Sequence, residues 1–260
     1  MARLVGWAGG RFFDTAVSGP SAPAGPLLVV ANHPNSLLDP ILVFRATGRV
    51  ARPLAKAPLF EHPLVGPMLL ALGGLPVFRR QDDPALMDRN EGTFDAAIAA
   101  LHAGEAVQIF PEGISHSAPA LAPLRTGAAR IALLAEERAG WRLGLRILPV
   151  GLTYRRKTLF RGQAAALLGE PLAVAPWAER HAEDPEAAVR ELTAAITAAL
   201  EAVTLNLTRE EDAELVDAAE RLYVRARGHA GAREAQDLAV RVPRMRRFAQ
   251  GLAWLRAHDP

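Results

Sequence analysis

A histidine and an aspartate that could act together in catalysis occur in the stretch NHPNSLLDP, as His33 and Asp39. A proline follows each of them and favours extended backbone, so the two side chains can meet only if the residues between them form a tight turn. Asn35 and Ser36 are residue types that turns favour. If the pair meets, Asp39 would hold one ring nitrogen of His33 and leave the other to remove a proton from a substrate hydroxyl. The alternative is that Asp39 only caps the next helix while His33 is an ordinary loop residue.

Two further polar stretches, FRRQDD and PEGISH, contain side chains that could bind a negatively charged ligand or a hydroxyl. Arg79 and Arg80 end an apolar run and are adjacent, so in a continued strand they point to opposite faces and one could reach a phosphate. In the other stretch, Glu112 could hold a hydroxyl or position an arginine, and Gly113 lets backbone amides approach a ligand closely. The alternative for the arginine pair is two solvated surface side chains.

Several other chemistries do not fit these residues. Ser115 and His116 are adjacent, but the nucleophile elbow of serine hydrolases requires G-x-S-x-G, and here the last position is Ser117. The seven histidines form no cluster with metal-ligand spacing, so no metal is expected. The chain has no cysteine, which excludes disulfides and a thiolate nucleophile, and its net charge of +2 is too small to argue for nucleic acid.

The polar stretches follow segments whose patterns predict an α/β fold. The predicted strands are residues 26–31, 50–56, 75–80, 106–110 and 143–155, and the predicted helices are residues 41–47, 63–74, 84–103 and 126–140. This alternation predicts a mixed sheet flanked by helices, and in open α/β sheets the ligand crevice lies beyond the carboxyl ends of the strands. We therefore expect the three polar stretches to form one composite site.

After about Leu168 the alternation gives way to helical patterns. The helical segments are residues 185–203, 209–227 and 234–257. At 260 residues and 27.8 kDa the chain is long enough for one large domain with an appendage. We predict a main domain at residues 1–204 and a C-terminal helical extension at residues 205–260 that packs against it.

Four stretches together resemble a known family. NHPNSLLDP, GGLPVFRR, FPEGISH and ILPVGLTY have the order and rough spacing of the four motifs of the glycerophospholipid acyltransferases, which include glycerol-3-phosphate and 1-acylglycerol-3-phosphate acyltransferases. The similarity covers about residues 25–155, roughly half of the chain. It implies an acyltransferase-like fold, makes residues 1–204 the acyltransferase domain, and outweighs the capping alternative for His33.

The resemblance also implies a role for individual residues. The family's catalytic histidine and aspartate fall on His33 and Asp39. The phosphate-contacting arginine of the second motif falls on Arg80, with Arg79 as its neighbour. The other positions implied to contact the substrate are Glu112, Gly113 and Arg125.

Two departures from the commonest family pattern look like the branch that includes eukaryotic glycerol-3-phosphate and dihydroxyacetone-phosphate acyltransferases. Five residues rather than four separate His33 from Asp39. Residues 114–116, Ile-Ser-His, replace the usual Thr-Arg-Ser, so an expected arginine is absent, and in that branch a basic residue stands where Arg125 does.

The implied reaction is direct acyl transfer without an acyl-enzyme. His33 would deprotonate the acceptor hydroxyl, which attacks the thioester of acyl-CoA or acyl carrier protein, so these are co-substrates and no cofactor is expected. The expected acceptor is 1-acyl-sn-glycerol-3-phosphate, in phospholipid biosynthesis. Glycerol-3-phosphate or another lysolipid is the alternative, and a non-catalytic lipid-binding protein is less favoured because His33, Asp39 and Glu112 are intact.

Contact with a membrane surface is expected because the acylated products stay in the bilayer. The most apolar uncharged run, residues 63–78, is too short and too broken by proline and glycine to span a membrane. Two basic amphipathic segments could bind the surface: the N-terminal residues 3–13, and residues 241–256, which have five arginines and no acidic residue. The alternative for the second is a helix docked on the core. We expect a cytoplasmic protein, peripheral to the inner face of the membrane, that binds no nucleic acid.

Overall fold

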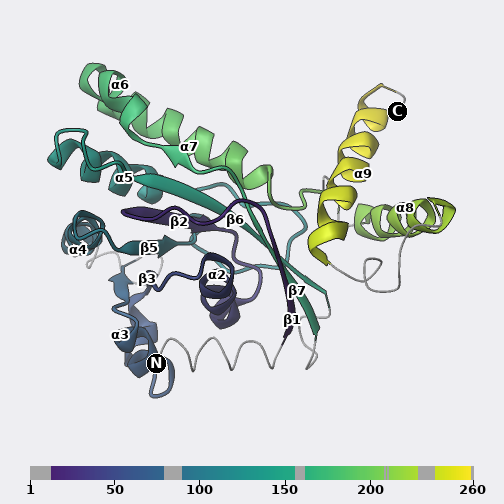
Figure 1. Ribbon diagram of the computed structural model, residues 1–260, viewed down its shortest axis with the longest axis horizontal. Helices are drawn as coiled ribbons and strands as arrows, with labels where there is room; N and C mark the ends of the chain where they lie inside the picture. The colour runs from purple at the N-terminus through teal and green to yellow at the C-terminus, as the bar shows by residue number, and fades with distance from the viewer. Residues whose placement is uncertain are drawn as a thin grey trace.

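The computed structural model describes residues 13–78, 90–155, 162–207, 209, 211–227 and 238–258. They form one mixed β-sheet with helices on both faces (Figure 1). In sheet order the strands are β1 (Phe13–Ser18), β7 (Gly162–Leu168), β6 (Arg146–Arg155), β2 (Leu27–Ala31), β5 (Ala106–Ile109), β3 (Ala51–Lys56) and β4 (Leu75–Val77). The short strand β8 (Leu172–Ala173) pairs with β6. Strands β2 to β6 run parallel to one another, and β7 and β1 run in the opposite direction.

The described helices α2 to α5 alternate with the strands along the chain, and α6 to α9 follow the last strand. They are α2 (Asp39–Thr47), α3 (Val65–Ala71), α4 (Asn90–His102), α5 (Gly127–Arg138), α6 (Ala178–Glu183), α7 (Pro185–Glu201), α8 (Asp212–Arg227) and α9 (Leu238–His258). Helices α4, α5 and α7 pack on one face of the sheet, and α2 packs on the other. The site described below lies where the loops after β2 and β5 meet α2.

Strand β2 is central and fully buried, as expected for a parallel strand covered on both faces. Leu28 and Val30 point into the core beneath α5, while Leu27 and Val29 contribute to the core beneath α2. This alternation fixes the register of β2 against β5 and β6, because a slip of one residue would exchange the two faces. The loop after β2, which carries His33, therefore starts from a rigid support.

The predicted fold class is confirmed, and the strands and helices expected between residues 26 and 155 occur within the described ranges. No strand was expected from the sequence at β1 or β7. Strand β7, GQAAALL, is rich in alanine, which favours helix by propensity. It nevertheless forms a strand because it pairs with β6 on one side and β1 on the other, and these tertiary partners override the local preference.

A connector, residues 203–207, leads from α7 towards α8 and crosses β6 at Gly151. A Cβ atom at Gly151 would lie 1.9 Å from the carbonyl oxygen of Val203, so any larger residue must push the strand and the connector apart. We expect Gly151→Ala to lower the free energy of unfolding by about 2–3 kcal/mol through overpacking.

Urea denaturation of this variant beside Gly251→Ala measures the effect. Gly251 lies within α9 with open space around its Cβ direction, so alanine there should instead stabilise the helix by about 0.5–1 kcal/mol. Equal midpoints for the two variants would contradict the close packing of the connector on β6.

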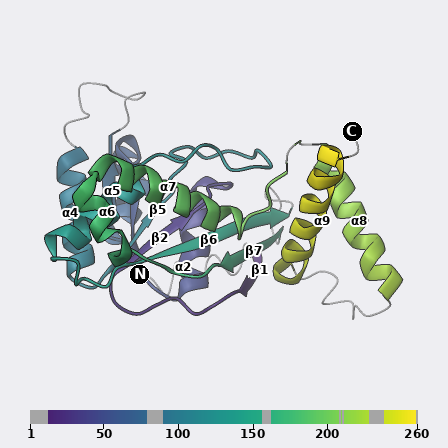
Figure 2. The ribbon, with the colours of Figure 1, turned by 90° about the horizontal axis from the view of Figure 1, so that it is seen from above.

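Helices α8 and α9 lie side by side beyond the β1–β7 edge of the sheet (Figure 2). Their contact is partly ionic: Arg241 donates to Glu220 at 2.9 Å and to Asp217 at 2.6 Å, and Arg244 donates to Glu220. Arg241 and Glu220 are both buried, and removing one partner of such a pair leaves an uncompensated charge. Arg241 and Arg244 belong to the segment expected to bind a membrane, but in the structure they form ion pairs with α8.

The apolar residues predicted to form a membrane-binding stripe on α9 also face α8. Met245, Phe248 and Leu252 are partly buried in a small core with Leu207 and Val216. This packing supports the alternative of a docked helix for most of the segment. None of the helices in the described ranges combines the length and apolarity that crossing a bilayer would require.

Candidate active site

The turn after β2 brings His33 and Asp39 together. Nδ1 of His33 donates to Oδ2 of Asp39 at 2.8 Å, and the backbone N–H of Asn35 donates to the same oxygen at 2.8 Å. Between them the chain forms a single 3-10 turn (Ser36–Leu38), and Ser36 has a φ of 44°, the left-handed conformation that makes the turn tight. Asp39 is the first residue of α2, and its carboxylate accepts from residues before the helix.

These contacts determine which nitrogen of His33 carries the proton. A carboxylate only accepts hydrogen bonds, so Nδ1 of His33 must be protonated and Nε2 has a lone pair available for a proton. The imidazole also stacks on Phe110, with ring centroids 3.9 Å apart and planes inclined by 13°. Its side chain is 20 % exposed, so the ring is not sealed off from solvent.

Asp39 is completely buried, and Tyr154 at the end of β6 interacts with it. Burial raises the pKa of the Tyr154 phenol well above its ordinary value, and the charge of Asp39 and a hydrogen bond to it raise this pKa further. Tyr154 therefore stays protonated and acts as a donor. Oδ2 of Asp39 accepts two hydrogen bonds, from His33 and from the backbone of Asn35, and these offset part of the cost of burying the charge.

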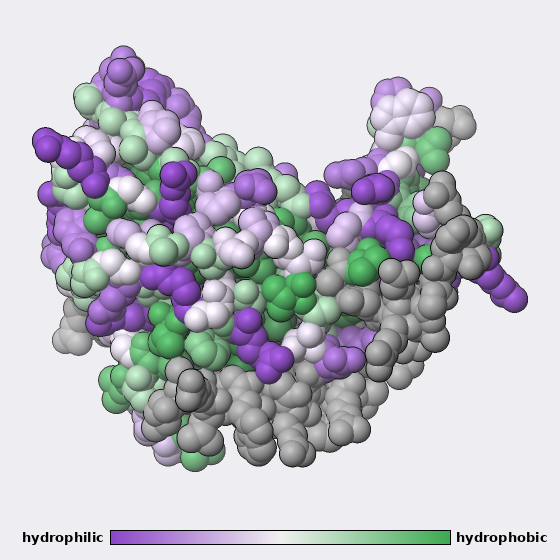
Figure 3. Space-filling view, in the orientation of Figure 1, coloured by the Kyte–Doolittle hydropathy of each residue, from purple (hydrophilic) through white to green (hydrophobic). Residues whose placement is uncertain are grey.

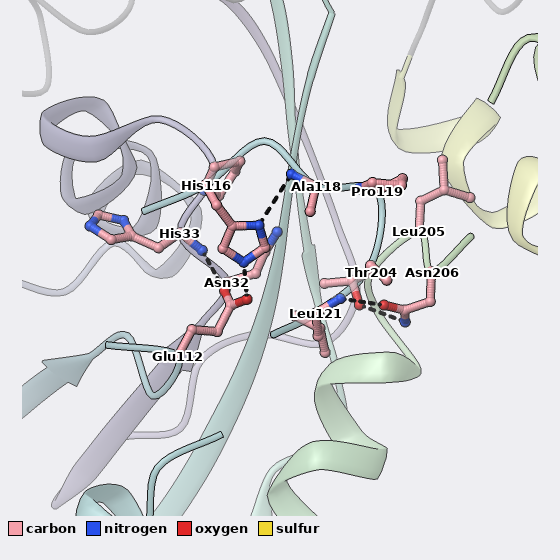
Figure 4. A pocket seen from close by; sticks show the side chains of 12 residues that line it. Asn32, His33, Glu112, His116, Ala118, Pro119, Leu121, Thr204, Leu205 and Asn206 are labelled. Atoms are coloured by element: carbon pink, nitrogen blue, oxygen red, sulfur yellow. Dashed lines mark hydrogen bonds and ion pairs between the residues drawn. The ribbon is translucent and has the colours of Figure 1, made fainter. Parts of the chain in front are cut away.

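Glu112, in the loop after β5, is also buried and accepts hydrogen bonds from three groups. The backbone N–H of His33 donates to Oε1 at 3.0 Å. Nε2 of His116 lies 2.5 Å from Oε2, and the backbone N–H of Ala122 donates to Oε2 at 2.8 Å. The sequence suggested that Glu112 holds a hydroxyl or an arginine, whereas here its oxygens hold the main chain of His33 and the loop that follows (Figure 4).

Gly113 is required by the path of the loop, because its φ of 70° is in the left-handed region. A Cβ atom at this position would lie 2.5 Å from Nε of Arg125, so the Arg125 side chain crosses directly over Gly113. The backbone of Arg125 is held by a hydrogen bond from its N–H to the carbonyl oxygen of Pro111 at 2.8 Å. Arg125 is exposed, and within the described ranges no carboxylate forms an ion pair with it.

Arg79 and Arg80 lie outside the described residues. The structure brings together the other predicted residues, namely His33, Asp39, Glu112, Gly113 and Arg125. Three residues without an assigned role also contribute: Phe110, His116 and Tyr154. The sequence offered a signal only for His116, which lies four residues after Glu112. Phe110 and Tyr154 could not be found from the sequence, because their contacts join distant segments.

A small cleft, open to solvent, lies on the side of the His33 main chain away from the imidazole (Figure 4). Glu112 and His116 line it on one side, and the connector residues Thr204 to Asn206 line it on the other. Asn206 accepts a hydrogen bond from the N–H of Leu121 at 3.1 Å, which ties the connector to the loop after β5. Figure 3 colours one face of the molecule by hydropathy. Apolar and polar residues are intermixed over the sheet domain on this face.

A histidine that is hydrogen-bonded to a buried carboxylate, on a mixed sheet flanked by helices, is an arrangement that can remove a proton from a hydroxyl. Residues 15–153 match the model of the family described as Acyltransferase. The match covers more than half of the chain, and the chain belongs to this acyltransferase family. The predicted kinship with glycerophospholipid acyltransferases is confirmed.

Two curated relatives come from Saccharomyces cerevisiae. Glycerol-3-phosphate O-acyltransferase 2 is 36% identical over 135 residues, which is 52% of this chain and 18% of that protein. Glycerol-3-phosphate O-acyltransferase 1 is 31% identical over 121 residues, 45% of this chain and 16% of that protein. The chain thus spans less than a fifth of the length of the curated relatives it matches.

Among solved structures, the fold is similar to the crystal structure of the 1-acyl-sn-glycerophosphate (LPA) acyltransferase, PlsC, from Thermotoga maritima. The TM-score is 0.53 at 22% sequence identity, covering 75% of this chain and 78% of that chain. At this identity the similarity establishes the acyltransferase fold, and the chemistry has to be argued from the residues of this chain.

Proposed function

We propose that the protein transfers a fatty acyl group from the thioester of acyl-CoA or acyl carrier protein to a hydroxyl of a glycerol phosphate, with His33 as the general base. The observation that carries the proposal is the His33–Asp39 hydrogen bond of 2.8 Å, which fixes the ring tautomer with Nε2 ready to accept a proton. Histidine, with an ordinary pKa of about 6.5, suits this work near neutral pH.

In the proposed reaction, one proton moves from the acceptor hydroxyl to His33 and then from His33 to the leaving thiolate. Nε2 of His33 removes the proton of the acceptor hydroxyl as its oxygen attacks the thioester carbonyl, and the buried Asp39 carboxylate stabilises the imidazolium that forms. A carbon–oxygen bond forms, the carbon–sulfur bond breaks, and the leaving thiolate takes the proton from His33. No acyl-enzyme is required, because the acceptor itself is the nucleophile.

Arg125 is the proposed contact for the acceptor phosphate, because its exposed guanidinium lies over Gly113 in the loop that also holds His33. The family resemblance adds Arg79 and Arg80 to this proposed phosphate site. Arginine's planar group with five donors suits phosphate better than lysine does.

The acceptor is proposed to be 1-acylglycerol-3-phosphate or glycerol-3-phosphate. The first was favoured from the motifs, and the second is supported by the names of the two yeast relatives, both glycerol-3-phosphate O-acyltransferases. Purified protein is offered glycerol-3-phosphate, 1-acylglycerol-3-phosphate and two lysolipids without a terminal phosphate, each with acyl-CoA and with acyl carrier protein. Transfer only to acceptors with a terminal phosphate is expected; transfer to none of them, or water as the preferred acceptor, would overturn the proposal.

We expect Gly113→Ala to raise the KM for the phosphate acceptor by about tenfold, because the new Cβ displaces an Arg125 guanidinium that makes charge-assisted hydrogen bonds. The matched control is Gly104→Ala. Gly104 also has a positive φ, of 77°, but open space around its Cβ direction, so it suffers the same backbone strain without a collision.

Steady-state kinetics with varied acceptor measure both variants. Arg125→Ala should reproduce the rise in KM, and Gly104→Ala should lose stability without changing KM. A normal KM in Gly113→Ala would show that Arg125 does not bind the acceptor.

We also propose that the protein acts at the inner face of the membrane from the cytoplasmic side, with the exposed end of α9 in contact with the lipid. Trp254 and Leu255 are more than half exposed, whereas Met245, Phe248 and Leu252, earlier in α9, are partly buried against α8. Tryptophan and leucine on a basic helix are residues that insert into the membrane interface.

We expect Trp254→Ala combined with Leu255→Ala to reduce flotation with anionic liposomes several-fold. A double substitution is preferable to truncation of α9, because truncation would leave the buried Glu220 without its arginine partners. Leu215→Ala, also an exposed leucine but on α8, is the control. Unchanged flotation of the double variant would exclude the end of α9 as the anchor.

A further inference from the structure

His116 uses both of its ring nitrogens inside the protein. The backbone N–H of Ala118 donates to Nδ1 at 3.1 Å, so the ring proton must lie on Nε2, and this group donates to Oε2 of Glu112 at 2.5 Å. An imidazole with one nitrogen accepting and the other donating is neutral and has no lone pair left for substrate. His116 therefore cannot serve as a second base in this arrangement, although it lines the cleft beside the site.

Both main-chain polar groups of His33, its N–H and its carbonyl oxygen, are bonded by the loop that contains Glu112 and His116. The N–H of His33 donates to Oε1 of Glu112 at 3.0 Å, and the carbonyl oxygen of His33 accepts from the N–H of His116 at 3.1 Å. Figure 4 shows Glu112 and His116 on one side of the His33 backbone and the imidazole on the other. The carboxylate of Glu112 thus sets where the Cα of His33 lies, and through it where Nε2 lies.

Within the described ranges, three donors reach the two oxygens of Glu112, and His116 is the only one of them that donates from a side chain. Rotation of the Glu112 carboxylate would break the bond to His33, and the short bond from His116 opposes that rotation. A charge-assisted hydrogen bond of this kind is about twice as strong as a neutral one.

We propose that His116 is a positioning residue for acyl transfer, which holds the Glu112 carboxylate in the orientation that places the main chain of His33 for base catalysis. The proposal rests on the proposed function, since it concerns the rate of the same reaction. The proposal gives a role to a histidine that the commonest family pattern does not have at this position. Residues 114–117 contain no arginine, and the side chain that bonds to Glu112 from this stretch is His116.

Two substitutions separate the two hydrogen bonds of His116. In His116→Gln the side-chain amide can reach Glu112 as a donor, as Nε2 does, but loses the acceptor for Ala118. In His116→Asn the shorter side chain can accept from Ala118, as Nδ1 does, but cannot reach Glu112. We expect kcat to fall by about 10- to 100-fold in His116→Asn and less than threefold in His116→Gln, with acceptor KM nearly constant in both.

A structural role alone would give a different result. If His116 only stabilised the loop, the two variants would lose thermal stability and keep the kcat of the folded fraction. A double-mutant cycle with Glu112→Gln adds a second check, because a residue acting through Glu112 should cost much less once Glu112 is already changed. Equal kcat for His116→Gln and His116→Asn, or additive effects in the cycle, would overturn the proposal.

The ring of His33 provides a readout that needs no turnover. In protein with ¹⁵N-labelled histidine, the wild type and His116→Gln should show His33 as a single Nδ1–H tautomer, and His116→Asn should show a mixture. If wild-type protein acylates none of the acceptors while the His33 signal responds as expected, the proposed function fails and the positioning role stands. An unchanged His33 signal in His116→Asn refutes the positioning role, whatever the activity.

Discussion

His33→Ala is expected to lower kcat by about 10²–10⁴-fold, the usual contribution of a general base. The substitution removes Nε2, the proposed proton acceptor, while the residues proposed to bind the acceptor phosphate are others. Initial rates at saturating substrates measure the loss, and KM for both substrates should change little. The effect should appear with every acceptor that the wild type uses, because the base acts on the hydroxyl that they share.

The fold should survive this change, since the His33 backbone bonds to Glu112 and His116 involve no side-chain atom of His33. The control is His102→Ala, which removes another imidazole. His102 ends α4, and its Nε2 lies 2.8 Å from the carbonyl oxygen of Ala135 in α5. Full activity in the control with retained activity in His33→Ala would mean that another group, or solvent, removes the proton.

Asp39→Ala is expected to lower kcat by about 10²–10⁴-fold as well, a range typical when the orienting carboxylate of a histidine base is lost. Without the carboxylate, nothing holds the His33 proton on Nδ1, and the backbone N–H of Asn35 loses its acceptor. Stability should also fall, because the donors around a fully buried site are left unpaired.

Asp39→Asn should fall between the wild type and Asp39→Ala. Both groups that face Oδ2 are donors, so the amide oxygen rather than the amide nitrogen will occupy that position. The tautomer of His33 is then preserved and only the negative charge is lost, which predicts a smaller loss in kcat than in Asp39→Ala, because a neutral hydrogen bond replaces a charge-assisted one. If Asp39→Asn is as slow as Asp39→Ala, the negative charge of Asp39 is what catalysis needs. If it is as fast as the wild type, holding the tautomer of His33 is enough and the charge is not needed.

The sequence alone determined the fold class and the identity of the central pair. Apolar runs that alternate with helical patterns predicted the sheet from β2 to β6, because burial imposes these periodicities locally. Turn-forming residues between His33 and Asp39 allowed the pair to meet, and the structure adds a 3-10 turn with Ser36 in the left-handed region. The roles of Arg79 and Arg80 remain predictions from the motifs.

Only the tertiary structure decided what holds this pair in place. Glu112 is 79 residues from His33 in sequence, and its bond to the His33 backbone follows from the parallel pairing of β2 with β5, which no local pattern reports. The same holds for β7, an alanine-rich segment that becomes a strand through its partners, and for α9, whose apolar residues pack against α8. Local composition limits what a segment can form, whereas long-range contacts determine which of its side chains face a neighbour, a ligand or solvent.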